Sequence, residues 1–308
     1  MKIYVNRKPV SGPWGGGNKS LTTLCEKLSL SGHNVVYDLN HQDIDIIFCF
    51  DPRPNDHGEW YQNFYDYRNA RPDTKIIQRV GDVGTHGKPE LTELVKASVE
   101  CSDYMIFPSE WAKEKINYNK SNFDIVYNAP LKVFHKHKNT IRYDKIINKI
   151  RIVTHHWSTN PKKGFDYYSY LDKFIEKNNR YEFTYIGRLP DNFVLKNSKH
   201  IEALDSNGLS LELSKYDLYL TASIEEAGAN HVIEAMACGL PIVYHKDGGS
   251  IVNYCSEYGL EYQCTETMIE MVDKIALNYR MYKNNVLEYN NTINTVIEKY
   301  INIICNIK

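Results

Sequence analysis

Short apolar runs alternate with helical patterns along most of this 308-residue chain. Strands rich in Ile, Leu, Val and Phe are predicted over residues 44–50 and 75–80 in the first half, and over residues 150–154 and Leu218–Thr221 in the second half. Continuous apolar runs are typical of strands that are buried on both faces, as they are in parallel sheets. Their alternation with helices predicts an α/β fold in which helices cover both faces of each sheet.

The length of the chain favours two domains of about 150 residues each over one large core. A charged segment without periodicity, residues 128–147, separates the two halves of the pattern. We predict an N-terminal Rossmann-like domain over residues 1–145 and a second one over residues 146–283. A C-terminal helix is expected over residues 284–308.

The charge balance argues against a nucleic-acid partner, because 37 Lys and Arg residues face 38 Asp and Glu residues for a net charge of −1. No apolar stretch is long enough to span a membrane, so at most peripheral contact is expected, for example through the basic residues 132–138. Seven cysteines without any C-x-x-C spacing indicate free thiols and a cytoplasmic location.

Two carboxylates stand eight positions apart in residues 224–243, IEEAGANHVIEAMACGLPIV. A helix is expected over residues 230–238, with Gly239 as its C-terminal stop. Glu226 then lies in the loop before the helix, and Glu234 lies inside the helix. Carboxylates accept hydrogen bonds from hydroxyl groups, so a pair of this kind suits a polyhydroxylated ligand.

The E-x7-E spacing followed by EAMACGLP resembles the signature of retaining glycosyltransferases with the GT-B fold, the family 4 type. This resemblance implies two doubly wound Rossmann-like domains facing a central cleft, with the last helix crossing back to the N-terminal domain. It implies transfer of a sugar from a nucleoside diphosphate sugar to an acceptor hydroxyl, with retention and without a metal or other cofactor. Glu226 would bind hydroxyls of the transferred sugar, Glu234 would bind the ribose, and Asn230 would join the donor-binding residues.

Residues 155–165, HHWSTNPKKGF, resemble the family segment in which an Arg and, five positions later, a Lys before Gly bind the donor diphosphate. Lys163 matches the lysine, and its charge would stabilise the departing diphosphate. Ser158 occupies the arginine position, so one cation is missing. The residues that could replace this cation are Lys162, His156 and Arg188.

The first half of the chain offers weaker candidates. Gly16 and Gly17 belong to a glycine-rich turn before the first helix, where exposed N–H groups could bind an anion or a sugar. Asp82 and His86 follow a strand and could position or deprotonate the acceptor hydroxyl. An Asx turn at Asp82 and an exposed imidazole at His86 are equally consistent with the pattern.

Other activities remain open at this level. Asp43 and Asp45 form a D-x-D motif, typical of metal sites in another glycosyltransferase fold, but here they open a strand and we expect no metal site. The missing cation at Ser158 also allows a catalytically inactive binding or scaffold subunit, and the fold allows a nucleotide-sugar epimerase or a phosphorylase. The acceptor could be a glycan, a lipid or a small molecule.

Overall fold

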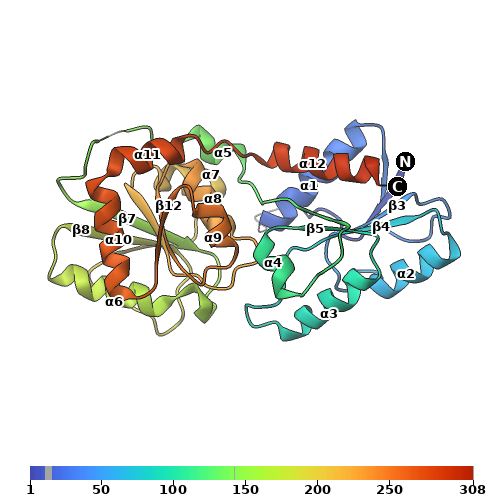
Figure 1. Cartoon of the computed structure of the whole chain (residues 1–308), viewed down its shortest axis with the longest axis horizontal. Coiled ribbons are helices and arrows are strands. Elements are labelled where there is room, and N and C mark those ends of the chain that lie inside the picture. The colour runs from blue at the N-terminus through green and yellow to red at the C-terminus, as the bar shows by residue number, and fades with distance from the viewer. Residues whose placement is uncertain (11–15, 142, 308) are drawn as a thin grey trace. The chain divides into compact units, whose positions relative to one another are not determined.

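The computed structural model describes residues 1–10, 16–141 and 143–307. It contains two six-stranded sheets in which every described strand pairing is parallel, and helices flank both sheets (Figure 1). The predicted α/β class with two doubly wound sheets is therefore confirmed. The chain divides into two compact units, unit 1 with Met1–Asn128 and Ile293–Lys308, and unit 2 with Ala129–Thr292.

Unit 1 has the strand order β2-β1-β3-β4-β5-β6. Its strands are β1 (Lys2–Val5), β2 (Asn34–Val36), β3 (Ile46–Cys49), β4 (Lys75–Arg79), β5 (Tyr104–Phe107) and β6 (Phe123–Ile125). Its helices are α1 (Gly16–Leu30), α2 (Tyr61–Ala70), α3 (Pro89–Glu100), α4 (Glu110–Lys115) and α12 (Ile293–Asn306). The direction of the winding reverses beside β1, and ligands of such sheets bind where the strands end at this reversal.

The C-terminal helix α12 packs against α1 in unit 1, and both lie on one face of the sheet, opposite α2 and α3 (Figure 1). The ring of Tyr300 lies 6.2 Å from that of Phe48 on β3, and Lys27 pairs with Glu298 at 3.0 Å. Apolar side chains from the end of the chain thus complete the core formed by its first strands.

The helical pattern near the C-terminus is interrupted, whereas the sequence predicts one helix from residue 284 onward. Helix α11 (Tyr279–Leu287) ends before a break, and α12 starts at Ile293. At the break, Lys138 Nζ donates to the carbonyl oxygens of Leu287 and Tyr289 at 3.0 and 2.9 Å. A cation suits this position because the last carbonyl groups of a helix lack partners within the helix.

Unit 2 has the strand order β12-β11-β10-β7-β8-β9. Its strands are β7 (Ile150–His156), β8 (Tyr181–Gly187), β9 (Lys199–Ile201), β10 (Leu218–Thr221), β11 (Ile242–His245) and β12 (Gly259–Tyr262). Its helices, besides α11, are α5 (Lys132–Lys136), η1 (Pro161–Lys163), α6 (Phe165–Glu176), α7 (Ser206–Leu213), α8 (Asn230–Ala237), α9 (Ser250–Cys255) and α10 (Thr265–Leu277). Apolar residues of α6 and α10 join those of the central strands in one buried cluster.

The segment between the two sheets packs as part of unit 2. Phe134 is fully buried, and the Asn139 amide donates to the carbonyl oxygens of Ser214 and Tyr216 at 3.0 and 3.2 Å. His135, within the basic stretch 132–138, bonds the Asn291 carbonyl at 2.8 Å. These residues therefore serve the packing of unit 2, although the sequence predicts a charged connecting segment.

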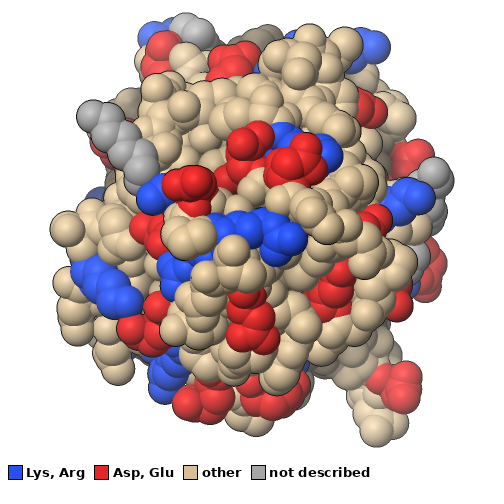
Figure 2. Space-filling model, turned by 90° about the vertical axis from the view of Figure 1, so that its right-hand side faces the viewer, with Lys and Arg blue, Asp and Glu red and all other residues tan. Residues whose placement is uncertain are grey.

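The visible surface is mixed in charge, with acidic and basic side chains interspersed on the face that Figure 2 shows. Asp43 and Asp45 both contact Lys2 at the amino ends of β1 and β3, through Lys2 Nζ at 2.5 Å and the Lys2 backbone N–H at 2.6 Å. They lie at the edge of the sheet opposite to the one where its strands end. Within the described ranges, no helix combines the length and hydropathy needed to cross a membrane.

Candidate functional site

The turn after β7 brings two lysines next to the loop after β10. The Asn160 side chain accepts a hydrogen bond from the Lys162 N–H at 3.0 Å, and the Lys162 carbonyl accepts one from Ile224 N at 3.0 Å. Gly164 has a φ of +80°, and a Cβ on it would lie 2.4 Å from the Ala222 Cβ. Only glycine tolerates both this conformation and this close approach. The Lys-Gly pair of the sequence motif thus holds Lys163 beside the Glu226 loop.

The loop that carries Glu226 is held by the turn after β11. Glu226 N donates to the Gly248 carbonyl at 3.2 Å, and Ser250 N donates to the Glu226 carbonyl at 2.8 Å. The Ser250 hydroxyl also accepts a bond from Ala229 N at 3.0 Å, just before α8. The polar groups of this Gly-Gly-Ser turn thus position the Glu226 backbone.

Two lysine–glutamate pairs form where these loops meet. Lys163 Nζ lies 2.5 Å from Glu226 Oε1, and their side chains are only 12% and 14% exposed. Lys162 pairs with Glu225, the neighbouring residue in each loop. A cation and a carboxylate with hydrogen-bonding capacity therefore share one partly buried position at the carboxyl edge of the second sheet.

Glu234 has a histidine partner that the sequence analysis missed. The His155 Nε2 lies 2.9 Å from Glu234 Oε2, and His155 is 7% exposed at the end of β7. Its Nδ1 is buried without a hydrogen-bond partner. The neighbouring ring, His231, bonds Thr221 Oγ1 at 3.0 Å from the first turn of α8. His155 stands at the end of a predicted strand, which is the only signal that the sequence carries for it.

His156 points into the core of unit 2. Its Nε2 lies 2.7 Å from the Tyr168 hydroxyl, which also accepts a bond from Ala222 N at 3.1 Å. Burial raises the pKa of Tyr168 to about 12, so this hydroxyl keeps its proton and can donate it to the imidazole. His156 is 3% exposed, and its ring also packs near those of Tyr185 and His231, with centroids 6.0 and 4.9 Å away.

Near the position where the motif lacks its arginine, the structure brings in another cation. Ser158 is exposed, and its hydroxyl accepts a bond from Asn160 N at 3.2 Å. The Arg188 guanidinium, just after β8, lies 4.3 Å from the ring centroid of Trp157, the residue before Ser158. Asn230 is the first residue of α8 and lies half-buried.

The candidates of unit 1 lie on separate loops. Gly16 and Gly17 form the first turn of α1, while the preceding Gly15 lies outside the described residues. Asp82 Oδ1 accepts a bond from Gly84 N at 2.9 Å, which makes the Asx turn, and its Oδ2 lies 3.1 Å from Lys88 Nζ. His86 lies half-buried in the turn that precedes α3.

No protein-family model matches the chain, and no curated protein matches its sequence. Solved structures do match over the full chain. A sucrose-phosphate synthase from Thermosynechococcus elongatus is 12% identical with a TM-score of 0.67, over 99% of this chain and 98% of that one. WaaG, a glycosyltransferase involved in lipopolysaccharide biosynthesis, is 14% identical with a TM-score of 0.66, over 99% and 100%. An E. coli trehalose-6-phosphate structure bound with UDP-2-fluoro glucose is 12% identical with a TM-score of 0.66, over the whole of both chains. The two doubly wound sheets and these matches give the chain the GT-B fold.

Proposed function

We propose that the chain is a glycosyltransferase that moves a sugar from a nucleoside diphosphate sugar to an acceptor hydroxyl. The observation that carries the proposal is the Lys163–Glu226 pair in the loops that follow strands of a GT-B sheet. In this proposal Glu226 binds hydroxyls of the transferred sugar, Glu234 binds the ribose, and Lys163 contacts the diphosphate. The E. coli structure of the same fold holds UDP-2-fluoro glucose, which is consistent with this donor class.

The Lys163–Glu226 pair suits a site that receives an anionic donor. A bound diphosphate would compete for the Lys163 ammonium, which frees Glu226 oxygens to accept sugar hydroxyls. The same ammonium would then stabilise the negative charge that collects on the diphosphate as its bond to the sugar breaks. The Lys163 ammonium would therefore have an anionic partner in both states, Glu226 before the donor binds and the diphosphate afterwards.

Arg188 is our candidate for the second cation, because its guanidinium stacks on Trp157 next to Ser158. Its planar fork can bind two phosphate oxygens at once. Asn230 remains a proposed donor contact, and the proposed role of His156 is indirect, because its buried imidazole is held by the Tyr168 hydroxyl. We further propose that the reaction retains the anomeric configuration and needs no metal.

The acceptor would meet unit 1. Asp82 or His86 is proposed to accept the proton that the acceptor hydroxyl loses, and the α1 N-terminus at Gly16 and Gly17 to contact a ligand through its N–H groups. Asp82 already receives hydrogen bonds from Lys88 and from the Gly84 N–H, so we favour His86 as the base.

The first test is thermal unfolding with a panel of nucleoside diphosphates and their sugar conjugates in the presence of a chelator. A ligand that binds only the folded chain raises its melting temperature, and a response to one base would name the donor. No response to any member of the panel would contradict the proposed donor site.

The second test measures sugar transfer by Glu226→Gln, with Glu225→Gln as the matched control. Both glutamates pair with a lysine in the same two loops, so the two variants lose a similar ion pair. We expect Glu226→Gln to lose roughly a hundredfold or more in turnover and Glu225→Gln to lose far less. Donor binding without transfer in the unmodified chain would instead indicate an inactive binding subunit.

A further inference from the structure

Arg79, the last residue of β4, is buried at the carboxyl edge of the unit 1 sheet. It is 7% exposed, and no other arginine among the described residues is buried. Among the described residues its Nε has no hydrogen-bond partner, and its Nη2 has one long contact, 3.5 Å to Asn128 Oδ1. A guanidinium carries five N–H donors, and burying a charge without a counterion is costly. The folded chain therefore leaves most of the binding capacity of Arg79 unused.

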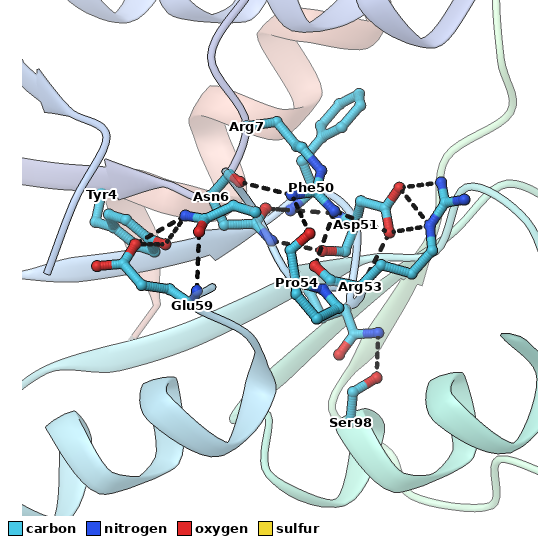
Figure 3. A network of polar contacts seen from close by, with 11 residues as sticks. Tyr4, Asn6, Arg7, Phe50, Asp51, Arg53, Pro54, Glu59 and Ser98 are labelled. Carbon is cyan, nitrogen blue, oxygen red and sulfur yellow. Dashed lines mark hydrogen bonds and ion pairs between the residues drawn. The ribbon is translucent and has the colours of Figure 1, made fainter. Parts of the chain in front are cut away.

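The carboxylates of this sheet edge are engaged elsewhere. Asp51 receives hydrogen bonds from Arg53, at 2.9 Å for Nε to Oδ1 and 2.5 Å for Nη2 to Oδ2 (Figure 3). Asp82 binds Lys88 and the Gly84 N–H. The undescribed residues 11–15, Ser-Gly-Pro-Trp-Gly, contain no carboxylate side chain. The described residues therefore provide no carboxylate partner for Arg79, and residues 11–15 do not provide one either.

Arg7, a neighbour on the same edge, shows how the fold treats an arginine with a structural role. Its guanidinium donates to the carbonyl oxygens of Pro54 at 3.0 Å and Arg53 at 2.8 Å, and lies 3.6 Å from Asp51 (Figure 3). Arg79 has no such carbonyl partners.

The surroundings keep the Arg79 guanidinium in place. Its Cζ lies 4.8 Å from the ring centroid of Phe50, the residue that follows β3. On another side, a Cβ on Gly81 would lie 2.3 Å from Arg79 Nη1, so the absence of a side chain at Gly81 makes room for the guanidinium. The charge lies between an aromatic ring and the space left by a glycine, at the edge where ligands of such sheets bind.

We propose that unit 1 binds an anionic group, a phosphate or a carboxylate, through the Arg79 guanidinium. A fork of parallel N–H groups matches either anion in the same way. The assignment of this anion to the acceptor rests on the proposed function, and it makes the acceptor an acidic sugar, lipid or small molecule. The anion site itself does not depend on that function.

The test is a titration of the full chain, labelled with ¹⁵N-arginine, followed through the arginine Nε–Hε signals by NMR. Sodium phosphate is added in one arm and sodium acetate in the other, at constant ionic strength. The Arg79 signal is assigned by its loss in Arg79→Lys. The internal control is Arg71, which also stacks on a ring of unit 1, that of Tyr67 at 4.5 Å, but donates its Nε–H to the Gln42 carbonyl.

We expect a saturable shift of the Arg79 signal and none of the Arg71 signal. Saturation with phosphate alone identifies a phosphate site, and saturation with acetate alone identifies a carboxylate site. The variant Gly81→Ala retains the arginine but places a methyl group against its guanidinium, and should weaken binding about tenfold or more. The proposal is overturned if the chemical shift of the Arg79 signal changes in neither titration. It is also overturned if Gly81→Ala has a native-like spectrum and binds the anion with unchanged affinity. Because each signal belongs to one residue, anion binding by the lysines of unit 2 does not affect the result, and failure of the nucleotide panel leaves it intact.

Discussion

The Lys163–Glu226 pair allows a quantitative prediction, because its atoms lie 2.5 Å apart and both side chains are largely buried. At this distance the attraction between two unit charges is about 7 kcal/mol for an effective dielectric constant of 20. Removing both groups from water costs several kcal/mol, so we expect a net coupling of about 2 kcal/mol, roughly thirtyfold in the unfolding equilibrium. Lys163→Met and Glu226→Gln should each destabilise unit 2, and the double variant should be more stable than the sum of the two losses predicts.

The assay is native-state hydrogen exchange of β7 and β10, neighbouring strands whose carboxyl ends lead into the loops with this pair. The control cycle uses Lys149 and Glu182, a pair at 2.9 Å in the same unit whose side chains are 56% and 51% exposed. Solvent screening should reduce that coupling to about 0.5 kcal/mol or less. Equal coupling energies in the two cycles, or additive losses at Lys163 and Glu226, would refute the reasoning.

Three further predictions concern the same unit. Gly164→Ala should destabilise the protein by about 2 kcal/mol or more in a thermal-shift assay, while Gly32→Ala, with a φ of +81° and open space around it, should show only the backbone cost. Burial, which outweighs the nearby Asp247 carboxylate, lowers the pKa of His245 below its ordinary value of 6.5, so the unfolded chain binds more protons near pH 6 and stability should fall from pH 7 to pH 5. His245→Asn, which keeps an acceptor for the Asp247 N–H, should reduce that slope, and an unchanged slope would exclude His245 as a cause. If Glu234 binds ribose, His155→Leu should weaken nucleoside diphosphate binding roughly tenfold without changing the affinity for inorganic phosphate, because the histidine orients Glu234 and does not touch the diphosphate.

Most strands and helices follow from the sequence because their signals are local. The apolar runs at β3 and β10 are buried throughout, and β7 is buried except at Arg151, as hydrophobic strands of a parallel sheet are expected to be. Elements with weak patterns were missed. Helix α2 is largely polar, with only Phe64 and Tyr67 buried, and β9 has two exposed residues out of three. Neither segment carries enough apolar periodicity to be recognised.

The sequence by itself determined the α/β class, the loop–helix placement of the two glutamates and the Lys-Gly turn, since each depends on residues within about ten positions. The tertiary structure decided which side chains contact one another. Lys163 meets Glu226 across 63 positions and His155 meets Glu234 across 79, and α12 completes the core of unit 1 from the far end of the chain. The sequence shows Arg79 as an ordinary strand-end residue, and only the fold shows that its Nε is buried without a hydrogen-bond partner among the described residues. Such pairings depend on which strands lie side by side. The strand order results from the burial of apolar surface over the whole chain, so a short segment of the sequence does not determine it.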